Sequence, residues 1–162
     1  MLGIVCGFTG RYTAYLLEMR VVLLEKIIVM LTMIENEVQY FNRPVQEIFT
    51  SLCSCKELKK LQFVFVCNEL MENGETFAHA WESALDSRSC VRFLKKDDVS
   101  VLRSFGEIFG TTDVDGQISN CRVHLRLAED KLSNARQSKE KYSSLFCGLG
   151  ALTGIGVFII LV

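Results

Sequence analysis

Residues 12–41, YTAYLLEMRVVLLEKIIVMLTMIENEVQYF, decide the fold of this chain. Apolar side chains recur there at intervals of three, four and seven positions, in the series Leu17, Val21, Leu24, Ile28, Leu31 and Val38. This spacing is close to the 3.5-residue period of helices that pack through an apolar seam. A helix of about 30 residues is about 45 Å long. The stretch therefore predicts one long helix that needs an equally long partner.

The expected partner lies in the last third of the chain. Apolar or small residues again recur every three or four positions, at Ile118, Cys121, Leu125, Ala128, Leu132 and Ala135. Charged residues occupy the remaining faces of this second periodic stretch. Because one long helix leads away from the first apolar end and the other leads back to the second, the two are expected to pack antiparallel.

The segment between the long helices is expected to form shorter helices and no sheet. From residue 11 to residue 144 there are only one proline and four glycines, too few turn residues for a many-stranded sheet. Residues 61–67, LQFVFVC, favour a strand by composition, but no partner strand is evident, so they are assigned to a helix. The expected short helices are Pro44–Cys53, Lys56–Asn73, Thr76–Leu85 and Asp98–Phe109.

Helix ends and core residues follow from local patterns. The expected end signals are Gly74 after the second short helix, Asp97 as N-cap of the last one, and Thr112 with Asp115 as a capping box for the long returning helix. The expected core contains Ile48, Phe49, Leu52, Leu61, Val64, Phe77, Trp81, Leu85, Leu102, Phe105 and Phe109. The predicted fold is thus an all-α helical bundle with two long antiparallel helices and shorter helices at the end distal to the chain termini.

Two apolar ends flank this bundle, since residues 1–10 and 142–162 carry no charge. Residues 145–162, LFCGLGALTGIGVFIILV, would form a helix of about 27 Å, close to the thickness of a bilayer core. Residues 1–10 would cover about 15 Å and are interpreted as a shortened membrane segment. Basic residues follow the first segment and precede the second, so residues 11–144 are expected to be a cytoplasmic domain.

The chemistry-bearing residues predict neither an enzyme nor a cofactor. A net charge of −1 argues against nucleic-acid binding, and neither a phosphate-binding loop nor a nucleophile elbow is present. Cys53-x-Cys55 and Cys121-x-x-His124 leave open a membrane-tethered thiol or zinc protein, although their spacing is atypical of zinc sites. We therefore expect no catalytic, cofactor-binding or metal-binding residues and no small-molecule substrate.

Other residue patterns point to contacts between proteins. Gly3 and Gly7, like Gly150 and Gly154, have the GxxxG spacing that lets membrane helices approach closely, although glycine can also simply be tolerated there. Another pattern is the acidic cluster of Glu35 and Glu37 beside Tyr40. It is interpreted either as a patch for basic residues of a partner or as a solvated helix face.

Several residues together resemble the stage III sporulation protein AB family. They are the stretch Ile34–Tyr40 followed by Pro44, the pair Ala80-Trp81, the motif Gly110-x-x-Asp113-x-x-x-Gln117, and the closing helix that leads to Leu145, Gly148 and Ile159-Ile160. The resemblance covers residues 12–162. It implies structural roles for Tyr40, Pro44, Trp81, Asp113 and Gln117. Departures from the family pattern are the short first apolar segment and Arg43 at a position where threonine is common.

The resemblance also implies a function. Family members are similar to the cytoplasmic domain of the F-type platform protein of type II secretion systems. They belong to the mother-cell machinery that faces the forespore of endospore-forming bacteria. The implied role is a non-catalytic platform at the cell membrane that docks a cytosolic secretion-type ATPase and other membrane subunits, with a homo-oligomer possible. A tail-anchored helical adaptor outside sporulation is the alternative.

Overall fold

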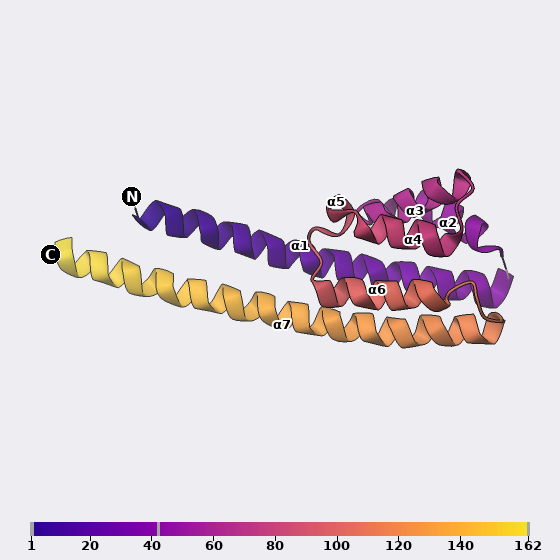
Figure 1. Ribbon diagram of the computed structural model, residues 1–162. Helices are drawn as coiled ribbons and strands as arrows, with labels where there is room; N and C mark the ends of the chain where they lie inside the picture. The colour runs from indigo at the N-terminus through magenta and orange to yellow at the C-terminus, as the bar shows by residue number, and fades with distance from the viewer. Residues whose placement is uncertain (1, 42, 162) are drawn as a thin grey trace.

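The computed structural model describes the backbone of residues 2–41 and 43–161, and the side chains of residues 12–41, 43–87, 89 and 91–142. Every regular element in this part of the chain is helical, which confirms the predicted fold class (Figure 1). The elements are α1 (Leu2–Asn36), the π-helical turn η1 (Glu37–Phe41), α2 (Val45–Ser54), the 3₁₀ turn η2 (Lys56–Leu58), α3 (Gln62–Glu72), α4 (Phe77–Asp86), α5 (Arg88–Val91), α6 (Lys96–Ile108) and α7 (Val114–Leu161).

Helices α1 and α7 form the predicted long antiparallel pair, and both chain ends lie at the same end of the molecule (Figure 1). Their seam buries Leu24 and Leu31 of α1 and Cys121, Ala128 and Ala135 of α7. Three ion pairs report the register: Glu18 with Lys139 at 3.4 Å, Glu25 with Arg136 at 2.8 Å and Glu35 with Arg122 at 2.7 Å. As the residue number increases along α1, the number of its partner in α7 decreases, as antiparallel packing requires.

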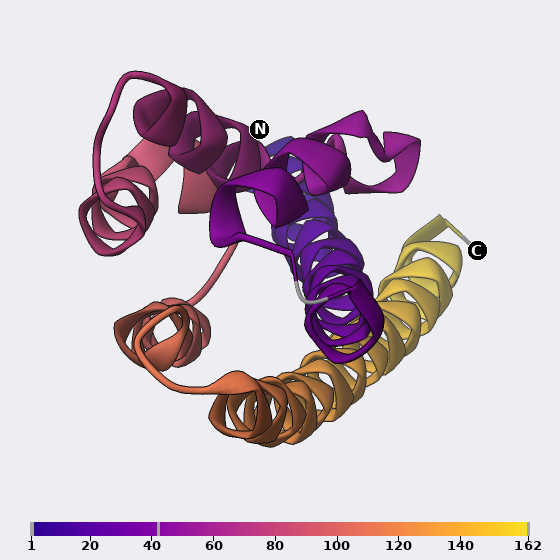
Figure 2. The same cartoon turned by 90° about the vertical axis from the view of Figure 1, so that its right-hand side faces the viewer.

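Helices α2 to α5 form a second layer on one side of the long helices, as Figure 2 shows in a view onto the end opposite the termini. α2 packs against α3, α3 against α4, and α4 against α6, which in turn packs against α7. Because α6 contacts both α4 and α7, it connects the layer of short helices to the long pair.

The core between these layers is centred on Trp81. Its ring lies 5.5 Å from the ring of Phe63 and 5.8 Å from that of Phe105, and its Nε1 donates a 2.8 Å hydrogen bond to the carbonyl oxygen of Leu102. A Cβ atom on Gly106 would lie 2.1 Å from the indole, so glycine is required for α6 to approach this closely. The predicted core residues are all buried except Phe77, which is partly buried.

The predicted helix 56–73 is wrong in its first part. The chain forms η2, breaks at residues 59–61, and enters α3 only at Gln62. Leu58 and Leu61 are both fully buried at this break, and the N–H of Leu61 donates to the carbonyl of Leu58 at 2.8 Å. Residues 62–67 are helical, as predicted, and α2 begins at Val45 with the carbonyl of Pro44 accepting from Glu47 and Ile48.

Two predicted N-caps are also wrong. α6 begins before Asp97, and the neighbouring carboxylate of Asp98 accepts from the backbone N–H of Lys95 at 2.9 Å. At the start of α7, Asp113 replaces the expected Thr112–Asp115 box, because its Oδ1 accepts from the N–H of Gly116 at 3.0 Å. The end signal at Gly74 is confirmed by its φ of 94° and its 3.0 Å bond to the Met71 carbonyl.

One ion pair is buried between α1 and α6. Arg20 donates from Nε to Oδ2 of Asp98 at 2.7 Å and from Nη2 to Oδ1 at 2.8 Å. The two side chains are 7% and 0% exposed. The periodicity of α1 places Arg20 beside the seam but does not reveal its partner, which lies 78 residues further along the chain.

The predicted membrane segments, residues 1–10 and 145–162, lie outside the described side chains. Their backbone is helical from Leu2 and up to Leu161 as parts of α1 and α7. None of the helices in the described part of the chain combines the length and the hydropathy needed to cross a membrane.

The buried ion pair yields a stability prediction. Asp98→Ala should lower the free energy of unfolding by about 3–5 kcal/mol, because Arg20 would stay buried without a partner. The double variant Arg20→Met/Asp98→Leu should recover most of that loss, since it removes both charges. Urea denaturation followed by circular dichroism measures both.

The matched control is Glu25→Ala, which breaks an exposed ion pair on the same helix and should cost about 1 kcal/mol or less. A loss of that small size for Asp98→Ala would contradict the assigned role of the buried pair.

Candidate interaction surface

Three turns meet at the end of the molecule opposite the chain termini, and we call them the distal end. They are the η1–α2 connection, the α3–α4 turn and the α6–α7 turn, which face the viewer in Figure 2. Gly74 and Gly110 allow two of these turns to be tight, with φ angles of 94° and 82°. The antiparallel order of the helices brings together segments that are far apart in the sequence.

The distal end is rich in carboxylates. Residues 37–47, 69–76 and 107–117 contain one basic residue, Arg43. Their exposed carboxylates belong to Glu47, Glu69, Glu72, Glu107, Asp113 and Asp115. The turns directed toward the chain termini have the opposite composition, because residues 55–61 and 87–97 contain seven lysines and arginines and two acidic residues. The molecule therefore has a charge difference along its length.

The structure brings Glu35, Glu37 and Tyr40 to the distal end. The two carboxylates are mostly buried, at 15% and 16% exposure. Glu35 accepts from Nε of Arg122 at 2.7 Å, and Glu37 lies 3.3 Å from Nη1 of Arg43. These carboxylates therefore stabilise the fold through arginines of the same chain, and the acidic surface is formed by other residues.

Exposed aromatic side chains mark the same end. Tyr40 is 70% exposed and Phe41 is 61% exposed. Both belong to η1, the π-helical turn that follows α1. The guanidinium carbon of Arg43 lies 5.0 Å from the centre of the Phe41 ring. Tyrosine and arginine are among the residues that contribute most to binding energy in protein interfaces. Neither Phe41 nor Arg43 was among the residues predicted for binding.

The remaining predicted site residues lie at helix starts or in the core. Pro44 precedes α2, Trp81 lies in the core, Asp113 caps α7, and Nε2 of Gln117 donates to the carbonyl of Thr112 at 3.0 Å. The predicted packing glycines Gly3, Gly7, Gly150 and Gly154 lie outside the described side chains.

The residues considered for metal binding are not assembled. His124 of α7 donates from Nδ1 to the Asn120 carbonyl, and its Nε2 lies 2.9 Å from Oγ of Ser104. Cys121 is buried in the long seam, whereas Cys53 belongs to α2. Among the described residues, no group of three or more histidine, cysteine, aspartate or glutamate side chains is placed to hold a metal ion.

Burial favours the protonated form of Cys67 and Cys121. It raises the pKa of Cys67 from 9.0 to about 12, with a smaller contribution from nearby Cys53. It also raises the pKa of Cys121 from 9.0 to about 12, with help from the negative charge of Glu35. Since the thiolate is the nucleophile and the metal ligand, neither thiol is suited to that chemistry near neutral pH.

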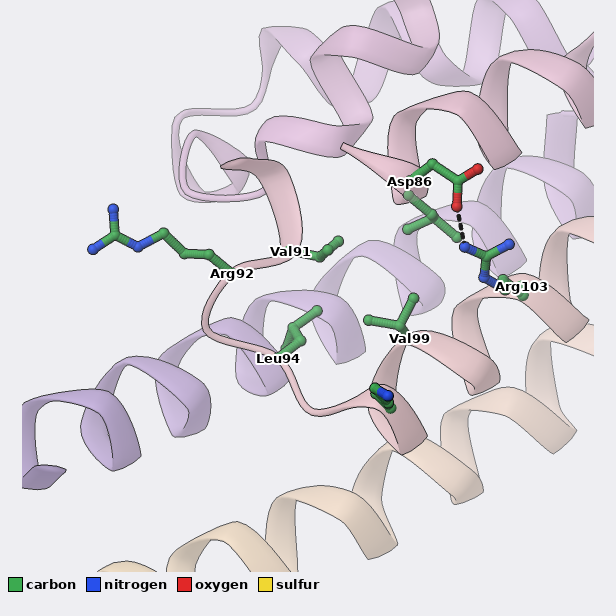
Figure 3. Close-up of a pocket in the computed structure, with 8 residues that line it drawn as sticks. Asp86, Val91, Arg92, Leu94, Val99 and Arg103 are labelled. Atoms are coloured by element: carbon green, nitrogen blue, oxygen red, sulfur yellow. Dashed lines mark hydrogen bonds and ion pairs between the residues drawn. The ribbon is translucent and has the colours of Figure 1, made fainter. Parts of the chain in front are cut away.

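A pocket of about 540 Å³ lies between the end of α4, α5 and the start of α6 (Figure 3). Leu85, Val91, Leu94 and Val99 form its apolar part, and the ion pair of Asp86 and Arg103 lies at one side. Arg92 points away from the other lining residues. The eight lining residues include no histidine, cysteine or serine, so the pocket offers no thiol or serine hydroxyl paired with a histidine base.

The fold defines a class of protein, an all-α helical bundle built on a long antiparallel hairpin. The chain belongs to the stage III sporulation protein AB family, whose family model matches residues 1–162. The family supports a role in sporulation.

Two known proteins illustrate the relationship. Stage III sporulation protein AB of Bacillus subtilis (strain 168) is 25% identical over 131 residues, which are 79% of this chain and 75% of that protein. A solved structure of stage III sporulation protein AB (SpoIIIAB) has a TM-score of 0.60 at 22% identity, covering 76% of this chain and 98% of that one, and supports the fold. Both names describe sporulation proteins and state no enzymatic activity.

The raised thiol pKa values predict a pH dependence. The thiols of unfolded chains ionise near pH 9, whereas Cys67 and Cys121 in the folded chain ionise near pH 12. Their contribution to stability is therefore full below pH 9 and is lost as the pH rises toward 12, by up to about 1.4 kcal/mol per thiol for each pH unit. Urea denaturation of the wild type and of Cys67→Ala/Cys121→Ala across this range measures the difference.

The double variant should show a shallower decline than the wild type. Val64→Ala is the control, because it truncates a fully buried side chain without removing a titrating group and should lower stability equally at every pH. Parallel curves for the wild type and the double variant would contradict the assigned thiol protonation.

Proposed function

We propose that this chain is a non-catalytic, membrane-anchored platform of the mother-cell complex that faces the forespore. In this role it docks a cytosolic secretion-type ATPase and other membrane subunits. The observation that carries the proposal is the exposed pair Tyr40 and Phe41, at the end of the hairpin opposite the two apolar chain ends.

The position of the chain ends supports anchoring at one side. The backbone of residues 2–10 and 145–161 belongs to α1 and α7 at the same end of the molecule, so both segments can enter the same bilayer from the same side. Lys139 and Lys141 precede the second segment and Arg11 follows the first. Basic residues next to membrane segments favour the cytoplasmic side, which is where an ATPase partner would be available.

The distal end has the composition of a docking surface. Two exposed aromatic rings next to Arg43 can supply the apolar contact area of an interface. The surrounding carboxylates can attract a basic partner surface and orient it before contact. The long hairpin holds this surface away from the membrane, because the part of α1 that follows residue 10 extends for about 40 Å.

The proposal predicts the effect of polar substitutions at the aromatic pair. Deletion of the gene should block sporulation after engulfment in the native host, and Tyr40→Ser/Phe41→Ser should lower the yield of heat-resistant spores by about tenfold or more, since loss of interface anchors costs about 2 kcal/mol or more. The double variant should also recover less ATPase by affinity purification from detergent extracts of sporulating cells.

The matched control is Val123→Ser/Leu127→Ser, which removes two exposed apolar side chains from the outer face of α7 and should leave spore yield unchanged. A normal spore yield from the deletion strain would remove the sporulation role. Equal yields from the two double variants, with a defective deletion strain, would place the docking surface elsewhere.

A further inference from the structure

The connection between α5 and α6 carries an exposed basic segment. It consists of residues 92–96, RFLKK, which we call the basic loop. The side chains of Arg92, Lys95 and Lys96 are exposed, and no ion pair among the described residues involves them. These cations are therefore available to an anionic partner.

Two contacts fix the loop against the first 20 residues of the chain, in α1. The ring of Phe93 meets the ring of Tyr15 edge-on with 5.9 Å between centroids. Just beyond the loop, Asp98 holds Arg20 through the buried ion pair. Figure 1 shows α5, which leads into the loop, at the end of the short-helix layer that is nearest the chain termini.

The direction of Arg92 agrees with this placement. Its guanidinium carbon lies 4.5 Å from the centre of the Phe93 ring. Figure 3 shows the side chain extending away from Asp86 and Arg103, which belong to the part of the pocket further from the termini. Arg92 thus points toward the end of the molecule at which the apolar segments begin.

The loop lies close to the level expected for lipid headgroups. The uncharged first segment ends at Gly10, five residues before Tyr15, which corresponds to about 7.5 Å along a helix. The polar layer of a bilayer leaflet is about 5–8 Å thick. Tyr12 and Tyr15 are 59% and 48% exposed at this level, and tyrosine is enriched where membrane proteins cross the headgroup layer.

We propose that Arg92, Lys95 and Lys96 bind the phosphate groups of anionic phospholipids, so that the basic loop rests on the membrane surface. The inference depends on the proposed membrane anchoring. Clusters of lysine and arginine beside a membrane segment are attracted to anionic leaflets, each contributing a factor of about five in affinity. The attraction acts within about 10 Å, so only basic residues near the surface contribute.

Hydrogen exchange of the full chain in lipid nanodiscs tests this proposal. One nanodisc contains only phosphatidylcholine, and the other contains equal parts of phosphatidylcholine and phosphatidylglycerol. Backbone amides of residues 92–97 should exchange about fivefold more slowly in the anionic nanodisc. The difference should shrink when salt is raised, since salt screens exposed charges.

Two charge-matched variants show whether position matters. Arg92→Gln/Lys95→Gln/Lys96→Gln should exchange at the same rate in both nanodiscs. Lys56→Gln/Lys59→Gln/Lys60→Gln removes three exposed charges next to Glu57, which pairs with Lys26 of α1. This second site lies about 16 Å further from the chain end than Tyr15, so this variant should keep the wild-type difference.

Three results would overturn lipid binding by the basic loop. Equal exchange of the wild-type loop in both nanodiscs, with the chain retained in them, would overturn lipid binding and leave the membrane platform intact. Loss of the difference in both triple variants would also overturn it, because the effect would then follow net charge alone. A chain that is not retained by nanodiscs would overturn the anchoring and the lipid contact together.

Discussion

The contact between Gly106 and Trp81 is the constraint on which the rest of the structure depends. It lets α6 lie directly on the indole, so that the aromatic core reaches from the short helices to the long hairpin. The same helix carries Asp98, which pairs with Arg20 of α1. Ser104 and the Phe105 carbonyl meet His124 and Asn120 of α7. One helix of 13 residues thus positions three separate parts of the chain.

The apolar repeats were sufficient to predict the long pair, because a seam of this length can be buried only by a second helix. The polar positions between these repeats predicted less about the fold. Glu35 and Glu37 could be recognised as an acidic cluster. The sequence did not show that they pair with Arg122 and Arg43 of the same chain. The sequence alone does not distinguish a helix carboxylate that pairs with a distant arginine from one that contacts solvent. The partner of Glu35 is 87 residues away.

The predictions of some helix ends were wrong for a related reason. Asp98, and not Asp97, accepts from the first turn of α6, and its buried partner Arg20 lies 78 residues away along the chain. The exposure of Phe41 follows from a π-helical turn that no spacing rule predicts. By contrast, the charge difference between the two ends can be predicted from the sequence once the helix directions are assigned. It requires only a comparison of the charged residues in successive turns, which lie alternately at the two ends. This charge difference supports the two proposals, in which the distal end meets a basic protein surface and the opposite end meets an anionic lipid surface.

Site-specific photo-cross-linking in sporulating cells tests this two-ended arrangement most directly. A photoreactive phenylalanine analogue at position 40 should form protein adducts that contain the secretion-type ATPase, and the same analogue at position 93 should form lipid adducts without it. ATPase adducts at position 93 and none at position 40 would contradict the account.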